Sequence, residues 1–211
     1  MKTLTFDIES LPAAEAQRET LMTLYLKQVK KNLPSFKRDG VVKTFEDFFH
    51  ETSFDGAFGR VLCIGFAVNE EPVKVICNGE NEKKTLEDFW IICRGVDRFV
   101  GHNIMDFDFR FLYQRSVILG VDPGIDMKWF FVRYKHDPVY DTMKEWSKWG
   151  QGNFGLEHIA LAMGIPTPKD GIDGSQVYAF YQEGKTKEIC DYCMRDVDTT
   201  REIYKRMNFS D

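Results

Sequence analysis

The chain has 211 residues, of which 43% are hydrophobic and 29% charged, as in an ordinary globular domain with a sizeable core. Its 28 Lys and Arg residues stand against 33 Asp and Glu residues, for a formal net charge of −5. This balance argues against a protein that binds nucleic acid through bulk positive charge. The longest apolar stretch, 61–68, has the length of a strand, so no membrane span is expected.

The cysteines and the first residues indicate a reducing compartment. Five cysteines form an odd set without the spacing of a disulfide framework, which favours reduced thiols. The N-terminal stretch carries one lysine and then Asp7 and Glu9, which is not the pattern of a signal peptide. We therefore expect a cytoplasmic protein.

Strand and helix patterns alternate along the chain. Four segments have strand patterns: 1–9, 61–68, 73–77 and 99–102. Four have helical patterns: 81–94, about 106–118, 156–163 and about 186–207. The second and third strands flank a turn-like Asn-Glu-Glu-Pro and predict an antiparallel hairpin. This order predicts an α/β fold with a mixed sheet.

About fifty residues between the first two strands are not needed by such a sheet. They contain a helical pattern near 13–31, followed by a loop that is punctuated by Pro34 and Gly40. We interpret the segment at about 11–58 as an insertion on a single domain that spans 1–211.

The first candidate site element is a pair of acids on the first strand. Asp7 and Glu9 stand two residues apart, so both side chains leave the same face near the C-terminal end of the strand. Open α/β sheets usually keep their sites at that end. Neighbouring carboxylates repel unless a proton or cation lies between them, and Mg²⁺ and Mn²⁺ prefer oxygen ligands. An isolated Asp-x-Glu pair is more often a solvated strand end.

The second element is the strand-to-helix junction at 101–108. Asp108 lies in or near the first turn of the predicted helix, where an acid also complements the helix dipole. Asp106 fits that capping role at least as well. The side chain of Asn103 could order a phosphate, a sugar hydroxyl or the loop itself.

The third element lies on the last predicted helix. Tyr192 and Asp196 are four residues apart, which places the phenol and the carboxylate on one face, one turn from each other. Taken alone, this pair is better interpreted as a semi-buried tyrosine beside a surface acid.

In this order, the three elements are more specific than any one of them. Phe-Asp-Ile-Glu, Gly-His-Asn-x-x-x-Phe-Asp and Tyr-x-x-x-Asp resemble the three motifs of the DEDD 3′–5′ exonuclease superfamily. Segments 174–177 and 191–197 look most like the proofreading exonuclease domains of family B DNA polymerases and their stand-alone bacterial relatives. Asp191 stands where a histidine-type member would carry histidine, so the chain resembles the tyrosine (DEDDy) type.

This resemblance implies a fold, a set of ligands and a chemistry. The fold is the ribonuclease-H-like three-layer α/β fold, with a mixed five-stranded sheet flanked by helices. Two divalent metal ions, Mg²⁺ or Mn²⁺, would be held by Asp7, Glu9, Asp108 and Asp196. Tyr192 would orient the water that attacks phosphorus. Candidate contacts to the terminal nucleotides are Ser10, His102, Asn103 and Phe107, although Phe107 fits a place in the core equally well.

The function implied is a metal-dependent 3′–5′ exonuclease that releases nucleoside 5′-monophosphates from single-stranded 3′ ends, with DNA favoured over RNA. Two alternatives stay open: an RNA-processing exoribonuclease, and a non-catalytic nucleic-acid-binding scaffold, which would be expected to lack a ligand. No polymerase module is expected, so the protein would act alone in repair or turnover, or with a protein partner in repair or replication.

Weaker signals accompany the motifs. Basic residues gather in the insertion (Lys27, Lys30, Lys31, Lys37 and Arg38), as either a phosphate-attracting patch or a solvated helix face. Segment 133–136, Arg-Tyr-Lys-His, mixes cations with an aromatic ring that could stack on a base. Cys190 and Cys193 have no second Cys or His pair at zinc-site spacing, so a zinc or redox site is disfavoured.

Overall fold

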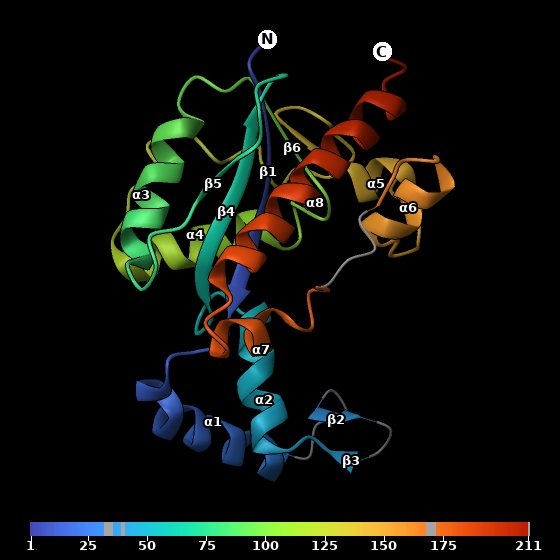
Figure 1. Ribbon diagram of the computed structural model, residues 1–211. Helices are drawn as coiled ribbons and strands as arrows, with labels where there is room; N and C mark the ends of the chain where they lie inside the picture. The colour runs from blue at the N-terminus through green and yellow to red at the C-terminus, as the bar shows by residue number, and fades with distance from the viewer. Residues whose placement is uncertain (32–35, 39–40, 168–171, 211) are drawn as a thin grey trace.

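The computed structural model describes residues 1–31, 36–38, 41–167 and 172–210. At its centre lies a five-stranded sheet in the order β5-β4-β1-β6-β7 (Figure 1). Its strands are β1 (Thr3–Leu11), β4 (Arg60–Val68), β5 (Lys74–Ile76), β6 (Arg98–Gly101) and β7 (Val139–Asp141). β4 runs antiparallel to β1 and β5, whereas β6 runs parallel to β1 and β7. The sheet is therefore mixed, and the predicted hairpin of β4 and β5 is confirmed.

Helices cover both faces of this sheet. The long helices are α3 (Glu82–Cys93), α4 (Asp108–Leu119) and α8 (Thr186–Met207). Shorter ones are α5 (Thr142–Trp146), α6 (Leu156–Ala162) and α7 (Val177–Gln182). In Figure 1, α8 (red) crosses one side of the sheet and α3 and α4 (green) lie on the other. The predicted three-layer α/β architecture is thus confirmed, and α8 has the predicted bounds.

Alternation along β1 divides its side chains between the two helical layers. Leu4, Phe6 and Ile8 are buried in a core shared with α3 and α4. Asp7 leaves the opposite face, where its carboxylate Oδ2 lies 3.7 Å from the Sγ of Cys193 in α8. Because a one-residue slip would expose the apolar set, burial of these side chains determines the register and hence the direction of the acids.

A glycine in β4 allows α8 to lie close to the sheet. Gly65 pairs with Asp7 in the strand register. A Cβ atom at Gly65 would lie 3.0 Å from Cys193 Sγ and 3.0 Å from Val197 Cγ2, closer than ordinary van der Waals contact. The missing side chain therefore brings the face of α8 that carries the third motif close to β1.

The segment between β1 and β4 forms a small unit with its own core. It contains a 3₁₀ turn (Glu15–Gln17), α1 (Arg18–Lys31), β2 (Lys37–Arg38), β3 (Val41–Val42), α2 (Phe45–Glu51) and a second 3₁₀ turn (Thr52–Phe54). Ala13, Leu21 and Phe49 are the buried members of its core. In Figure 1 this unit lies beyond one end of the sheet. That it is an insertion on a single domain stays a prediction.

The helix expected near 13–31 is confirmed as the 3₁₀ turn and α1, but the loop expected after it is wrong in part. A short hairpin of β2 and β3 and the helix α2 occupy much of that stretch. α2 begins with a capping box in which Thr44 and Asp47 exchange hydrogen bonds, a local start signal that overrides the loop composition. Pro34 and Gly40 lie outside the described residues.

Candidate active site

Three elements bring the four predicted carboxylates together. Asp7 and Glu9 lie on β1, Asp108 is the first residue of α4, and Asp196 lies on α8. The backbone N–H of Ile8 donates to Asp108 Oδ1 at 3.2 Å, which fastens the start of α4 to β1. Residues almost 190 positions apart in the sequence thus share one cluster, in which Glu9 and Asp108 are buried and Asp7 and Asp196 are half-buried.

The electrostatics of this cluster favour the uptake of positive charge. Burial raises the pKa of Asp7, and repulsion from Cys193 and the neighbouring carboxylates raises it further. Burial likewise raises the pKa of Glu9, with Asp196 and Asp108 adding to the shift. Burial also raises the pKa of Asp108 to about 7 and that of Asp196 to about 6. Buried acids that repel one another, each presenting hard oxygen donors, fit divalent cations.

The thiol of Cys193 positions the first of these acids. Its Sγ lies 3.5 Å from the backbone oxygen of Asp7 and accepts the N–H of Gly65 at 3.2 Å. One potential ligand atom from each of Asp7, Glu9 and Cys193 lies within 4.8 Å of the others. In the described part of the chain, no other group of three His, Cys, Asp or Glu side chains brings its ligand atoms this close together, and neither Asp108 nor Asp196 belongs to this group. Hard cations prefer the carboxylates over the thiol.

Tyr192 lies beside Asp196, as their spacing predicts. Burial, followed by the negative charges of Asp196 and Glu9, raises the pKa of Tyr192. The phenol therefore stays protonated at neutral pH and can donate a hydrogen bond. A cavity of about 440 Å³ opens beside the pair and is also lined by Arg195 and Gln176.

Arg195 is a residue of this cavity that sequence reasoning missed. Its guanidinium carbon lies 6.0 Å from the centroid of the Tyr192 ring. Its buried Nε has no hydrogen-bond partner among the described residues. A guanidinium with a free donor that lines a cavity fits an anionic group such as a phosphate. The available signal was its position, directly before Asp196 in the third motif.

Three of the four predicted substrate contacts, His102, Asn103 and Phe107, lie in the loop from β6 to α4. Asn103 has a left-handed backbone, with φ of 59°, and its N–H donates to Asp141 Oδ1 at 3.1 Å. Phe107 precedes α4, with its ring centroid 6.3 Å from that of Phe54 and 5.6 Å from that of Phe111. It therefore packs against the core on one side and meets an exposed ring of the segment before β4 on the other.

Two of the predicted contacts, His102 and Ser10, hold parts of the fold together. His102 Nε2 lies 2.8 Å from the carbonyl oxygen of Phe154, and Nδ1 lies 2.9 Å from Thr142 Oγ1. Burial lowers the pKa of His102 to about 4, so the ring is neutral and Nε2–H donates to that carbonyl. Ser10 Oγ donates to the carbonyl of Ser53 at 2.7 Å. Ser10 also lines a groove of about 470 Å³ between α2 and α7.

Asp141 is a second residue that sequence reasoning missed. It ends β7 and is 1% exposed. Its carboxylate accepts the backbone N–H groups of Asn103 and Met105, each at 3.1 Å, and two N–H groups in the first turn of α5. It therefore shapes the loop that ends at Asp108. An acid at a strand end before a helix was the available signal.

These features match a known protein family. Residues 55–211 match a family described as a predicted 3′–5′ exonuclease related to the exonuclease domain of PolB. The chain belongs to this family. The matched range contains Asp108, Tyr192 and Asp196, and it begins after Asp7 and Glu9, which lie on β1.

The fold is also similar to a solved structure. The family B DNA polymerase from the hyperthermophilic archaeon Pyrobaculum calidifontis superposes with a TM-score of 0.63 at 16% identity, over 98% of this chain and 24% of that chain. This likeness confirms the ribonuclease-H-like exonuclease-domain fold implied by the motifs. The chain thus corresponds to about a quarter of the polymerase chain.

One relative of the chain is an uncharacterised archaeal protein. This protein of Methanocaldococcus jannaschii is 26% identical over 162 residues, which cover 69% of this chain and 84% of that protein.

No helix among the described residues is long and apolar enough to cross a membrane.

Proposed function

We propose that the chain is a metal-dependent 3′–5′ exonuclease of the DEDDy type. It would remove nucleoside 5′-monophosphates from single-stranded nucleic acid, with DNA favoured over RNA. The observation that supports this proposal is the convergence of four buried or half-buried carboxylates, with a protonated tyrosine beside Asp196 and a cavity that Tyr192 and Asp196 line. Membership of a PolB-related exonuclease family adds to it.

Asp7, Glu9, Asp108 and Asp196 would hold two divalent cations, Mg²⁺ or Mn²⁺. Such ions supply a water nucleophile of lowered pKa and neutralise charge on the leaving oxygen. The carboxylates contribute the negative charge that binds the ions. The hydrogen bond from the N–H of Ile8 to Asp108 joins β1 to α4 and holds Asp108 in place beside the acids of β1.

The remaining side chains would act on water and phosphate. Tyr192 would donate a hydrogen bond to the attacking water and orient it, since its raised pKa disfavours a role as base. Arg195 would pair with a non-bridging phosphate oxygen. The new bond joins the water oxygen to phosphorus, and the bond from phosphorus to the 3′ oxygen of the preceding nucleotide breaks. A 5′-monophosphate leaves, and a new 3′ hydroxyl remains.

Asp7→Asn and Asp196→Asn test this assignment. Each variant removes one negative charge with little change in shape, and we expect each to lower Mn²⁺-dependent release of nucleotides by at least about a thousandfold. Activity is measured on a 5′-labelled single-stranded oligonucleotide, with thermal unfolding as the check on folding. Asp191→Asn, on the same helix, is the matched control and should keep wild-type activity. Undiminished cleavage by both site variants would overturn the assignment.

Side-by-side digestion of matched DNA and RNA oligonucleotides separates the favoured substrate from the exoribonuclease alternative, because a 2′-hydroxyl distinguishes the two chemically. We expect faster cleavage of DNA.

Calorimetric titration with Mn²⁺ tests the alternative that the chain is a non-catalytic scaffold. Absence of binding at millimolar Mn²⁺ would favour the scaffold and contradict the enzyme.

A further inference from the structure

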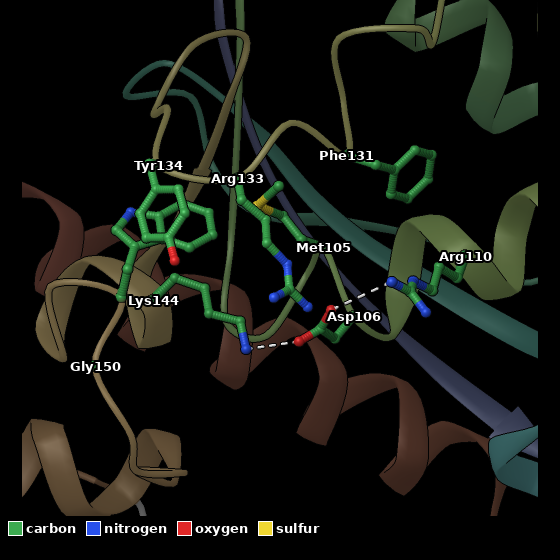
Figure 2. Close-up of a pocket in the computed structure, with 9 residues that line it drawn as sticks. Met105, Asp106, Arg110, Phe131, Arg133, Tyr134, Lys144 and Gly150 are labelled. Atoms are coloured by element: carbon green, nitrogen blue, oxygen red, sulfur yellow. Dashed lines mark ion pairs between the residues drawn. The ribbon is translucent and has the colours of Figure 1, made fainter.

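A further pocket lies beside the loop that leads to Asp108. Its volume is about 160 Å³. Figure 2 shows residues around it from the β6–α4 loop, α4, the segment before β7, α5 and the segment after α5. They are Met105, Asp106, Arg110, Phe131, Arg133, Tyr134, Lys144, Trp149 and Gly150. The function proposed above gives this pocket no role.

The pocket concentrates positive charge on an acidic protein. Three cations, Arg110, Arg133 and Lys144, line it together with one acid, Asp106. Asp106 bridges two of them: its Oδ2 lies 2.6 Å from Lys144 Nζ and its Oδ1 lies 3.6 Å from Arg110 Nη2, as the dashed lines in Figure 2 mark. Arg133 forms no ion pair with any described residue. The pocket therefore has a net excess of cations and an uncommitted guanidinium, which suits a phosphate.

Aromatic rings stand next to these cations. The rings of Tyr134 and Trp149 lie 5.3 Å apart between centroids, and Tyr134 is 74% exposed. Phe131 and Trp129 are also exposed, and Lys135 Nζ lies 5.2 Å from the Trp129 ring centroid. Solvent-accessible rings alternating with cations are the composition by which proteins bind single strands, since rings stack on bases while cations pair with phosphates.

We propose that this pocket is a subsite for single-stranded nucleic acid, which binds a phosphate through Arg133 and Lys144 and a base through Tyr134. The proposal rests on the proposed function. Met105 and Asp106 belong to the loop that leads to Asp108, which links the pocket to the second motif along the chain. In this proposal, a strand whose 3′ end lies at the carboxylates continues into the pocket with its 5′ portion. A single nucleotide held at the carboxylates would then leave the pocket empty.

This arrangement predicts different effects on long and short substrates. In Arg133→Gln and Tyr134→Ala, the dissociation constant for a single-stranded oligonucleotide should rise about tenfold, because one phosphate contact or one stacking contact is lost. The slope of log affinity against log salt should become shallower by about 0.7 in Arg133→Gln and stay unchanged in Tyr134→Ala. Hydrolysis of the p-nitrophenyl ester of thymidine 5′-monophosphate should stay at the wild-type rate in both.

Binding is measured by fluorescence anisotropy of a labelled oligonucleotide in Ca²⁺, and hydrolysis in Mn²⁺. Arg206→Gln is the matched control: it removes an exposed arginine from the last turn of α8 and should leave affinity and salt slope unchanged. Thymidine 5′-monophosphate serves as a competitor, and failure to displace the oligonucleotide from the pocket supports a strand subsite over a free-nucleotide site.

Wild-type affinity and salt slope in Arg133→Gln would overturn the subsite. A matching loss of activity on the short ester would also overturn it, because Arg133 would then act at the reacting phosphate. If the wild-type protein binds the oligonucleotide but hydrolyses neither substrate, the proposed function fails, while the affinity comparison still decides whether the pocket binds the strand.

Discussion

Asp7, Glu9 and Asp108 are unfavourable to bury as anions, because water no longer solvates them and each repels the others. Glu9 and Asp108 are only 7% and 3% exposed. Apolar side chains at these positions would contribute more to the stability of a packed core. On the proposed function, a bound cation would offset this repulsion, and the cluster would cost stability when the cation is absent.

The proposed contact of Arg195 with phosphate can be tested by substitution. Arg195→Gln should lower kcat/KM on an oligonucleotide by about tenfold to a hundredfold, since one charge-assisted hydrogen bond to phosphate is lost. Arg195→Lys should recover part of the loss, because it keeps the charge without the two-donor fork. Steady-state kinetics give the comparison. Calorimetric affinity for Mn²⁺ should not fall in either variant, and a fall would assign Arg195 to the support of the carboxylates instead.

Among the secondary-structure elements, the short strand β7 helps to position two neighbouring segments. Through Asp141 it orders both the loop before Asp108 and the start of α5. Asp7 and Glu9 lie on a strand and Asp108 lies at a helix start, and the positions of such elements depend on end contacts of this kind. An element of three residues therefore helps to determine where the second motif lies.

The variant Asp141→Ala tests whether Asp141 orders the β6–α4 loop and the start of α5. Four backbone N–H groups lose their acceptor, so the free energy of unfolding should fall by about 3–5 kcal/mol. Asp141→Asn keeps one acceptor oxygen and should lose about half as much. Urea denaturation measures both. Asp126→Ala, which removes an exposed acid, is the control and should change stability by at most about 0.5 kcal/mol. Equal stability of Asp141→Ala and wild type would contradict this role.

For the whole molecule, the net charge and the candidate site are connected. The formal charge is −5, and two divalent cations would change it to −5 + 4 = −1. On the proposed function, the excess of acid would belong in part to a cation site. Phosphate recognition would then depend on local features, Arg195 and the basic pocket, and not on the overall charge.

The stability of the whole fold should therefore depend on metal and pH together. The folded-state pKa values of Asp108 and Asp196 are raised by burial to about 7 and about 6, so the folded protein binds more protons than the unfolded chain. Stability without metal should fall as pH rises from about 4 to about 7. At pH 8 Asp108 and Asp196 have lost their protons, and Mn²⁺ at about 100 times its dissociation constant should add about 2.7 kcal/mol.

Differential scanning fluorimetry with and without Mn²⁺ measures this effect. We expect the melting temperature to rise by about 5–10 °C at pH 8, and by much less at pH 5.5, where protons compete with the metal. Asp7→Asn should reduce the increase at pH 8. An increase of equal size at both pH values would contradict proton-linked binding by these acids.

Much of this protein was predictable from local patterns. Period-two alternation places Leu4, Phe6 and Ile8 in the core and sends Asp7 and Glu9 to the other face, because only one face can be buried among apolar side chains. The four-residue spacing of Tyr192 and Asp196 is a property of any helix. The order of the three motifs indicated the family, which the family match confirms.

Other features depend on contacts between residues far apart in the sequence. The strand β7 is too short to show a periodic pattern, so its place at the sheet edge follows from pairing with β6. Asp141 and Arg195 look like ordinary surface residues until packing shows which donors and cavities they meet. The basic pocket collects residues from several separate segments. Which side chains share a face depends on local geometry, so it can be predicted from the sequence. Which faces meet depends on long-range packing, so it is seen only in the folded chain.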